Sequence, residues 1–268
     1  MPPAITLGPL LLPTDRLLAF LAIGMFLALV ALADRFLATR ASSAATLACV
    51  VGAVASRIAY VVMNWTSYAD DPVSAFAIWQ GGFSAPIGIA AAFLTLLLNV
   101  GRSRALAVTG AALGMATAAW LTVSVATAEP VRPFPRGMMI WTAAGDPIAI
   151  DTSIGRPFVV NLWATWCGPC RRELPMLTRA ASAHGALPIL LVNQGEDMQT
   201  VAAFLSRARI EPTHVTMDAS RDLSRALDIA GYPATAFVAA DGTIVRLQLG
   251  ELSRAALYDG IEHATKHR

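Results

Sequence analysis

Two of the three cysteines in this chain, Cys167 and Cys170, stand three residues apart in the stretch NLWATWCGPCRRELP, residues 161–175. The apolar residues before them predict a buried strand, and the charged residues after them predict the start of a helix. At a helix N-terminus, free backbone N–H groups and the helix dipole would stabilise a Cys167 thiolate. Such a thiolate attacks a disulfide readily, and Cys170, one turn later, could then close the ring and expel the substrate.

The two residues between the cysteines fit this chemistry. Pro169 fixes φ near the helix start without removing a needed N–H, and Gly168 leaves the attacking sulfur uncrowded. A zinc site would need a second ligand pair, and a purely structural disulfide would not need a strand-to-helix position. The sequence has no second CxxC, and we expect no metal and no cofactor beyond a redox-active Cys167–Cys170 disulfide. The histidines lack a spacing that would complete a metal set; they are His184, His214, His263 and His267.

The segment VVNLWATWCGPCRRELP resembles the active site of the thioredoxin superfamily, specifically its membrane-anchored, extracytoplasmic TlpA/ResA-like branch. The resemblance covers about residues 138–266 and implies a protein disulfide oxidoreductase in which Cys167 attacks and Cys170 resolves. Asn161 stands where thioredoxins usually have a buried Asp. Glu173 matches the acidic residue of this branch and would assist proton transfer, unless it is only a first-turn glutamate that interacts with the helix dipole.

The stretch AGYPATAFV, residues 230–238, supplies the other half of this family's site. Pro233 matches the cis-proline that faces the CxxC and holds the backbone extended for pairing with a substrate strand. Tyr232, just before it, is at a position that often affects substrate choice in the superfamily. We expect Trp163 and Trp166 to pack around the cysteine pair, so that the substrate cleft would be formed by Trp163, Trp166, Gly168, Pro169 and Tyr232.

The composition divides the chain into two unlike parts. Of 268 residues, 56% are hydrophobic and 14% charged, which is too apolar for an ordinary soluble domain. The net charge of +2 and the lack of a Lys/Arg run argue against nucleic-acid binding. We expect a polytopic membrane domain in residues 1–126, a Pro-rich linker in 127–137 and a thioredoxin-like domain in 138–268.

Four apolar segments of the first part are candidates for membrane crossings of about 20 residues each. They are residues 15–34, 44–63, 84–100 and 104–126. Arg35 and Arg40 in the first loop and Arg102 and Arg104 in the third predict cytoplasmic loops, whereas the second loop carries Asp70 and Asp71. The thioredoxin-like domain would then lie in the periplasm of a Gram-negative-type bacterium, anchored in its inner membrane. A cleavable signal peptide ending near "ALA", 31–33, is the competing interpretation.

Arg57 stands inside the second segment, where a charge usually faces a bundle interior, a polar partner or the headgroups. Around it, GAVASRIAYVV and AFAIWQGGFSAPIGIAAAF resemble part of the prolipoprotein diacylglyceryl transferase family, over about residues 45–95. The matching positions are Arg57, Tyr60, Trp79, Gly81, Gly82 and Ser84. This chain lacks the family's Phe-His-Gly-Gly continuation, which argues against transferase activity and leaves a shared membrane scaffold that contacts lipids.

The second part alternates strand-like and helix-like segments, which predicts a mixed central sheet flanked by helices. The fold class is therefore an α-helical membrane bundle followed by an α/β thioredoxin-like domain. Asp-Gly in ADGT, 240–243, predicts a primed hairpin turn, so that the last two strands would pair antiparallel at a sheet edge. Predicted strands cover 157–164, 187–193, 213–218, 234–240 and 244–250, and helices cover 168–184, 197–208, 220–229 and 253–266.

The direction of electron flow stays open at this point. A reductase in an oxidising compartment needs electrons, which implies a membrane donor of the DsbD/CcdA kind, with cytochrome c maturation or oxidatively damaged periplasmic proteins as clients. A thiol oxidase of the same fold, or a lipoprotein transferase with an appended redox domain, are the alternatives. Cys49 is alone in the second segment, so this chain should not carry electrons across the bilayer by itself.

Overall fold

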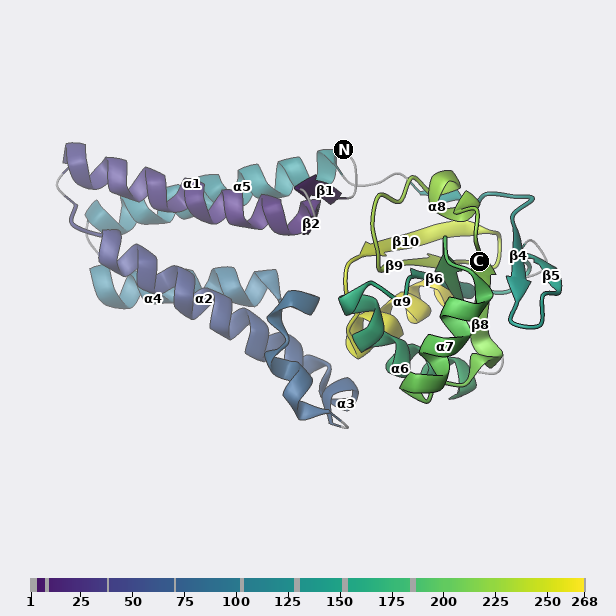
Figure 1. Ribbon diagram of the computed structural model, residues 1–268. Coiled ribbons are helices and arrows are strands. Elements are labelled where there is room, and N and C mark those ends of the chain that lie inside the picture. Colours follow the sequence, from purple (N-terminus) through teal and green to yellow (C-terminus); the bar gives the residue numbers. More distant parts are fainter. Residues whose placement is uncertain are drawn as a thin grey trace. The chain divides into compact units, whose positions relative to one another are not determined.

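The computed structural model describes residues 4–7, 10–37, 39–69, 71–101, 104–127, 131–150, 154–183 and 187–267 (Figure 1). The chain forms two compact units, built mainly from Leu12–Glu129 and from Pro130–Arg268. Near the N-terminus, β1 (Ala4–Leu7) and β2 (Leu10–Pro13) form a two-stranded sheet. Asp70, Arg102 and His184, which entered the sequence arguments, lie outside the described residues.

The first unit is a bundle of helices, with α1 packed on α5 and α2 on α4 (Figure 1). Three of them, α1, α2 and α5, are long and apolar enough to cross a membrane. The fourth, α4, has 16 residues and a length of about 24 Å, short of a hydrocarbon core of about 30 Å, so its crossing stays a prediction. The elements are α1 (Thr14–Leu37), α2 (Ser42–Met63), α3 (Trp65–Tyr68), η1 (Pro72–Phe76), η2 (Ile78–Gln80), α4 (Ala85–Val100) and α5 (Arg104–Ala126).

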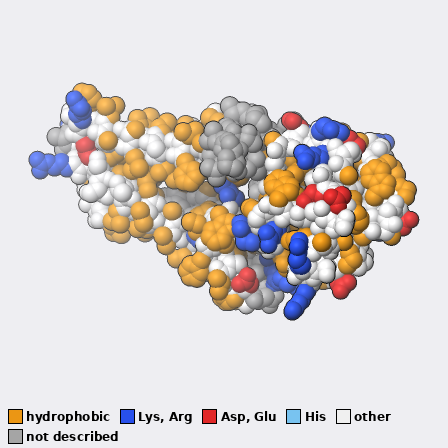
Figure 2. All heavy atoms as spheres, viewed as in Figure 1, with side chains coloured by type: hydrophobic (Ala, Val, Ile, Leu, Met, Phe, Trp, Pro, Cys, Tyr) orange, Lys and Arg blue, Asp and Glu red, His pale blue; other side chains and the backbone are white. Residues whose placement is uncertain are grey.

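The outward faces of these helices are apolar. Figure 2 shows hydrophobic side chains over much of their visible surface, with the few charged side chains near the ends of the helices. Phe20 on α1, Ile58 on α2, Leu98 on α4 and Val125 on α5 are all exposed. A water-facing helix would carry polar residues there, so this surface fits a lipid environment.

Small residues let α2 and α4 approach closely. A Cβ on Gly52 would lie 2.9 Å from the carbonyl oxygen of Gly88, and a Cβ on Gly88 would lie 2.9 Å from the Cβ of Ser56. The Ser84 N–H also donates to the Ser56 carbonyl, at 3.1 Å, where the chain enters α4. Glycine and serine at a helix interface are typical of membrane bundles, where close backbone contact replaces the hydrophobic effect.

Asp34 closes the connection between α1 and α2. Its carboxylate accepts the backbone N–H groups of Ala41, at 2.8 Å, and Ser42, at 2.9 Å, and also the hydroxyls of Thr39 and Ser42. These contacts satisfy groups at the N-terminus of α2 that have no partner within the helix. The role of the Asp34 carboxylate is therefore to stabilise the turn between α1 and α2.

The second unit is an eight-stranded mixed sheet with the order β3-β10-β9-β6-β7-β8-β4-β5. Strands β6, β7 and β8 are parallel, and β9, β10 and β4 run antiparallel to their neighbours. The strands are β3 (Arg132–Pro133), β4 (Met139–Thr142), β5 (Pro147–Ala149), β6 (Phe158–Trp163), β7 (Ile189–Gln194), β8 (Val215–Asp218), β9 (Ala234–Val238) and β10 (Thr243–Leu249), and the helices are α6 (Gly168–Ala183), α7 (Met198–Ala208), η4 (Pro212–His214), α8 (Asp222–Ala226) and α9 (Arg254–Lys266).

The predicted strands and helices of this unit all form, with differences at their edges. Part of the expected linker, Arg132–Pro133, is a strand that pairs with β10, so β10 is not the sheet edge. Strands β4 and β5 were not predicted, and α8 is shorter than the expected helix. The predicted primed turn is wrong: Gly242 has φ +85°, but Asp241 does not have a positive φ, and its carboxylate accepts the Thr243 N–H instead.

We predict that Gly88→Ala destabilises the helical unit. The new methyl group would lie 2.9 Å from the Cβ of Ser56, so α2 and α4 must move apart and lose contacts. The measurement is the melting temperature of the full-length protein in detergent. Gly114→Ala on α5 is the matched control, because a Cβ there meets nothing within 4 Å, and the variant should melt no lower than the wild type. Equal melting of the two variants would contradict this packing.

Candidate active site

The two cysteines lie where β6 gives way to α6, as the sequence predicted. Cys167 and Cys170 are joined by a disulfide, with their Cα atoms 5.3 Å apart. The Cys170 N–H points at the Cys167 Sγ, at 3.2 Å, and the Arg171 N–H donates to the Cys167 carbonyl. Cys167 is therefore the residue that caps α6, with a free helical N–H aimed at its sulfur. This geometry favours negative charge on Cys167 once the disulfide is opened.

The residues between the cysteines leave that turn open. A Cβ built on Gly168 would meet only the Arg172 Nη1, at 3.9 Å. Pro169 is the second residue of α6, where a missing N–H costs the helix no hydrogen bond. Both residues therefore fit the first turn, and their role in a substrate cleft stays a prediction.

Glu173 lies one turn beyond Cys170 and is almost completely buried, with 3% of its surface exposed. Its carboxyl group accepts the Asn161 side-chain N–H at 2.8 Å and the Leu252 backbone N–H at 2.7 Å. The pKa of Glu173 is raised to about 8, chiefly because the side chain is buried; the charge of Glu251 also raises it, while the two hydrogen bonds and Arg172 act in the opposite direction. The alternative of a first-turn glutamate that interacts with the helix dipole does not describe this environment.

Asn161 links Glu173 to the sheet. It is fully buried on β6, and its amide also donates to the Thr235 hydroxyl, at 2.9 Å. Residues 161 and 235 are direct neighbours in the antiparallel pairing of β6 and β9. The position of the carboxyl group of Glu173 is thus set by hydrogen bonds from two separate elements, β6 and the turn after β10.

The Tyr232–Pro233 peptide bond is cis, as the resemblance implied. The Pro233 carbonyl accepts the Gly250 N–H, at 2.9 Å. Tyr232 donates to or accepts from the Ser224 hydroxyl, at 2.9 Å, and its ring lies 5.9 Å from that of Trp166. Trp166, with 66% of its surface exposed, therefore links the CxxC segment to the loop that carries Pro233.

Trp163 is not part of this surface. The prediction that it lines the substrate cleft is wrong, because it is fully buried and packs against Phe204 of α7, with ring centroids 5.8 Å apart. It belongs to the same core cluster as Cys167 and Cys170. All six residues of β6 are buried, which means that the sheet is covered on both faces at this strand. A strand of this kind sends no side chain into a surface cleft.

Sequence reasoning missed Glu196, which holds the segment just before Cys167. Its carboxylate accepts the Thr165 N–H at 2.7 Å and the Thr165 hydroxyl at 2.5 Å, and also the Asn193 side-chain N–H at 2.7 Å. These contacts of Glu196 could not be predicted from the sequence, because they depend on the parallel pairing of β6 with β7, which places Asn193 beside Trp163.

In the helical unit, two of the candidate residues, Gly81 and Gly82, lie in contact with Arg57. The buried guanidinium donates to the backbone carbonyls of Ala75, Gly81 and Gly82, at 2.5 to 2.9 Å, and to that of Ser74 at 3.2 Å. It also faces the rings of Tyr68 and Phe83. The Trp79 carbonyl accepts a hydrogen bond from the Arg16 guanidinium. These contacts make Arg57 an anchor for the segment between α3 and α4.

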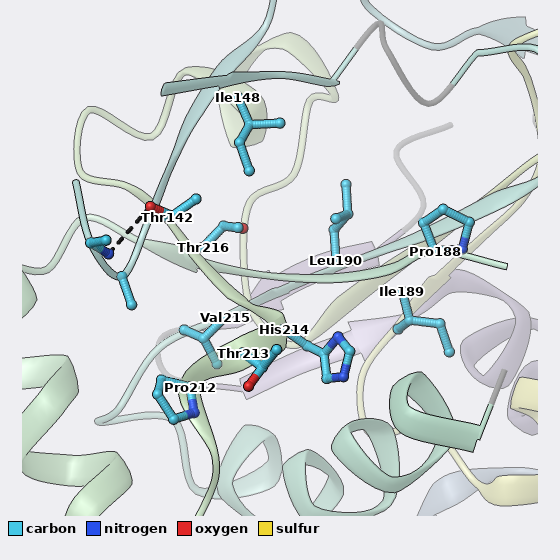
Figure 3. A pocket seen from close by; sticks show the side chains of 12 residues that line it. Thr142, Ile148, Pro188, Ile189, Leu190, Pro212, Thr213, His214, Val215 and Thr216 are labelled. Carbon is cyan, nitrogen blue, oxygen red and sulfur yellow. Dashed lines mark hydrogen bonds between the residues drawn. The ribbon is translucent and has the colours of Figure 1, made fainter. Parts of the chain in front are cut away.

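A pocket of about 320 Å³ lies elsewhere on the second unit (Figure 3). It is formed at the amino ends of β7 and β8, with Ile148 and Leu190 pointing toward each other across it. Cys167 follows the carboxyl end of β6, which is parallel to β7 and β8, so this pocket is at the opposite end of the strands from the cysteines. It therefore plays no part in the site described above.

Comparison with known proteins finds relatives of the second unit. The Redoxin family model matches residues 131–261. The thiol-disulfide oxidoreductase ResA of Bacillus subtilis is 26% identical over 43% of this chain, although the match covers only 65% of ResA, just under two thirds. The sporulation thiol-disulfide oxidoreductase A of the same organism is 23% identical, covering 54% of this chain and 89% of its own length. The thiol:disulfide interchange protein DsbE of Pseudomonas fluorescens is 29% identical, covering 51% and 75%.

Among solved structures, a DsbE from Chlorobium tepidum is 21% identical with a TM-score of 0.46, covering 51% of this chain and 97% of its own. The structure of MTB dsbF is also 21% identical, with a TM-score of 0.45, and covers 48% of this chain and 95% of its own. The second unit is thus similar to thiol-disulfide oxidoreductases in its Redoxin match and its named relatives, and it carries a Cys167–Cys170 disulfide. The Redoxin match begins at residue 131, and nothing found supports the transferase resemblance of residues 45–95.

We predict that Glu173 holds a proton at neutral pH in the folded, oxidised protein. Infrared spectra of the full-length protein should show a protonated carboxyl band that disappears with a midpoint near pH 8 and is absent in Glu173→Gln. The unfolded chain releases this proton near 4.5, so the folded state binds one more proton between about 4.5 and 8, and stability should fall as the pH rises through that window.

Glu262→Gln is the control for this titration. Glu262 is exposed on α9 and paired with Lys266, which holds its pKa below the usual range. The band should be unchanged in this variant. A band that persists in Glu173→Gln would show that a different carboxyl group carries the proton.

Proposed function

We propose that this protein is a membrane-anchored, extracytoplasmic thiol-disulfide oxidoreductase that reduces disulfides of other proteins. The observation that carries the proposal is the arrangement of three groups: a disulfide at the head of α6, a cis-Pro233 loop connected to it through Trp166 and Tyr232, and the buried Glu173 one turn behind it. Together they supply a nucleophile, an extended backbone for a substrate strand and a group that can exchange a proton.

The reaction starts from the dithiol form. The Cys167 thiolate attacks one sulfur of a client disulfide, which breaks the client S–S bond and forms a mixed disulfide, and the leaving client thiolate takes up a proton. Cys170 then loses its proton and attacks the Cys167 sulfur. The second client thiol is released, and the Cys167–Cys170 disulfide seen in the structure is the oxidised product. Two electrons and two protons pass to the client.

Glu173 fits the proton step of the second attack. Cys170 is fully buried, so water does not reach its thiol easily. A carboxyl group with a pKa of about 8 lies on the same helix three residues later, on a neighbouring position of the same face. A base with a pKa in that range can accept a thiol proton and return it near neutral pH, which an ordinary glutamate cannot do as well.

The helical unit supports a position at a membrane. It contains three helices that are long and apolar enough to cross, and Arg35 and Arg40 flank the α1–α2 connection as expected of a cytoplasmic loop. With α4 as a fourth crossing, the thioredoxin-like domain lies outside the cytoplasm. Clients are then periplasmic proteins, of the kind used in cytochrome c maturation or damaged by oxidation.

In that compartment, the Cys167–Cys170 disulfide of a reductase must be reduced again after each turnover. The electrons come from a membrane dithiol donor of the DsbD/CcdA type, because Cys49, the one cysteine in the helical unit, has no second cysteine there with which to form a disulfide relay. The names of the relatives ResA and DsbE, thiol-disulfide oxidoreductase and thiol:disulfide interchange protein, support the same class of chemistry.

We predict that Cys170→Ser traps a mixed disulfide between Cys167 and client proteins, because nothing then attacks the Cys167 sulfur. Cys167→Ser should trap none. The measurement is nonreducing electrophoresis of membranes from cells that express each full-length variant, with reducing electrophoresis as the control. If Cys167→Ser instead traps a client through Cys170, then Cys170 is the attacking cysteine and the proposed roles are wrong.

The reduction potential of the full-length protein decides whether it acts as a reductase or as an oxidase. It is measured by titration with glutathione, with Cys167→Ser as the blank. A value toward the thioredoxin end, about −270 mV, is expected for a reductase. A value toward about −120 mV would make the protein an oxidant of the DsbA type, which is the alternative function.

The topology is tested with single exposed cysteines in the Cys167→Ser/Cys170→Ser background. We expect Gln199→Cys on α7 to react with a membrane-impermeant maleimide in intact spheroplasts, and Ser43→Cys at the start of α2 to react only after lysis. The background protein, which retains Cys49, measures unspecific labelling. The reverse pattern would place the redox domain in the cytoplasm.

A further inference from the structure

A second carboxylate, Glu251, lies next to the buried Glu173. Glu251 follows β10 and has only 5% of its side chain exposed. Its neighbour in the chain, Leu252, donates the N–H that Glu173 accepts at 2.7 Å, and the preceding Gly250 donates to the carbonyl of Pro233. The turn 250–252 thus contacts both the cis-proline loop and the proton-carrying side chain.

Arg172 pairs with this second carboxylate from the other side. Its Nε and Nη2 atoms both contact the Glu251 Oε2, at 2.9 and 2.5 Å. Arg172 is 55% exposed, so the pair has one buried and one solvated member. It follows Cys170 by two residues and precedes Glu173 directly, and its Nη1 lies over Gly168 of the CxxC turn. The ion pair therefore bridges the cysteine helix and the turn beside Pro233.

Two buried carboxylates close together do not both ionise easily, because each charge raises the cost of the other. A cation that contacts only one of them decides which one keeps the proton. Here the guanidinium contacts are with Glu251, whereas Glu173 has only neutral donors, the Asn161 amide and the Leu252 N–H. The charges of both residues act on the pKa of Glu173, which Glu251 raises and Arg172 lowers.

We propose that Arg172 and Glu251 are positioning residues for the redox site: their ion pair fixes a permanent negative charge beside Glu173 and so keeps the exchangeable proton on Glu173. This rests on the proposed thiol-disulfide chemistry, in which Glu173 exchanges a proton with Cys170.

The test is the infrared titration of Glu173 in full-length, oxidised Glu251→Gln. Removal of the neighbouring charge should lower the midpoint of the Glu173 carboxyl band by about one pH unit, and the pH dependence of mixed-disulfide resolution should shift downward with it. The matched control is Asp259→Asn, which breaks the Arg246–Asp259 ion pair at 2.6 Å on the same domain. It should leave both measurements unchanged. An unchanged midpoint in Glu251→Gln overturns the inference.

Arg172→Gln is the second variant, and it breaks the same ion pair from its exposed side. Without the guanidinium the charge beside Glu173 is no longer fixed, so the midpoint of the Glu173 carboxyl band should differ from that of the wild type. A spectrum identical to the wild type also overturns the inference. The two proposals fail separately: if Cys170→Ser traps no client, the proposed function is wrong, but the band titrations still decide whether Arg172 and Glu251 control Glu173.

Discussion

The burial of one carboxyl group constrains the whole redox site. Placing Glu173 in the core is unfavourable for its charged form, so the structure surrounds it with donors that suit either protonation state. Those donors come from β6, through Asn161, and from the turn after β10, through Leu252. Because Glu173 also belongs to α6, the same group joins that helix to the strand before it and to a turn 79 residues further along the chain. The cysteines at the head of α6 are thereby held relative to the sheet.

The parallel pairing of β6 and β7 decides at which end of the strands the site forms. The carboxyl ends of β6 and β7 meet at one edge of the sheet, and there Cys167, Thr165 and Glu196 come together. Complete burial of β6 turns Trp163 into the core, while Trp166, beyond the strand end, reaches the surface. Two tryptophans only three residues apart therefore have different roles, and the end of the strand separates them.

The sequence allowed the prediction of the features that depend on local spacing. Cys167 at a helix start, Pro233 in a cis bond and the alternating strands and helices were all visible, because each follows from neighbouring residues or a matched motif. Glu196 and Glu251 were not, since their partners, Thr165 and Arg172, are 31 and 79 residues away. The Asp241-Gly242 turn was misjudged in its type, because one Gly with positive φ already closes that hairpin.

The helical unit applies the same physical rule to a group of opposite charge. Arg57 is also buried, with 8% of its surface exposed, and backbone carbonyls of the segment between α3 and α4 surround its guanidinium. An arginine does not release its proton in a protein, so its burial can fix a structure but cannot carry a proton. A buried glutamate can do both. The difference between the two side chains is why the contacts of Arg57 describe an anchor, whereas those of Glu173 suit the proton step proposed for it.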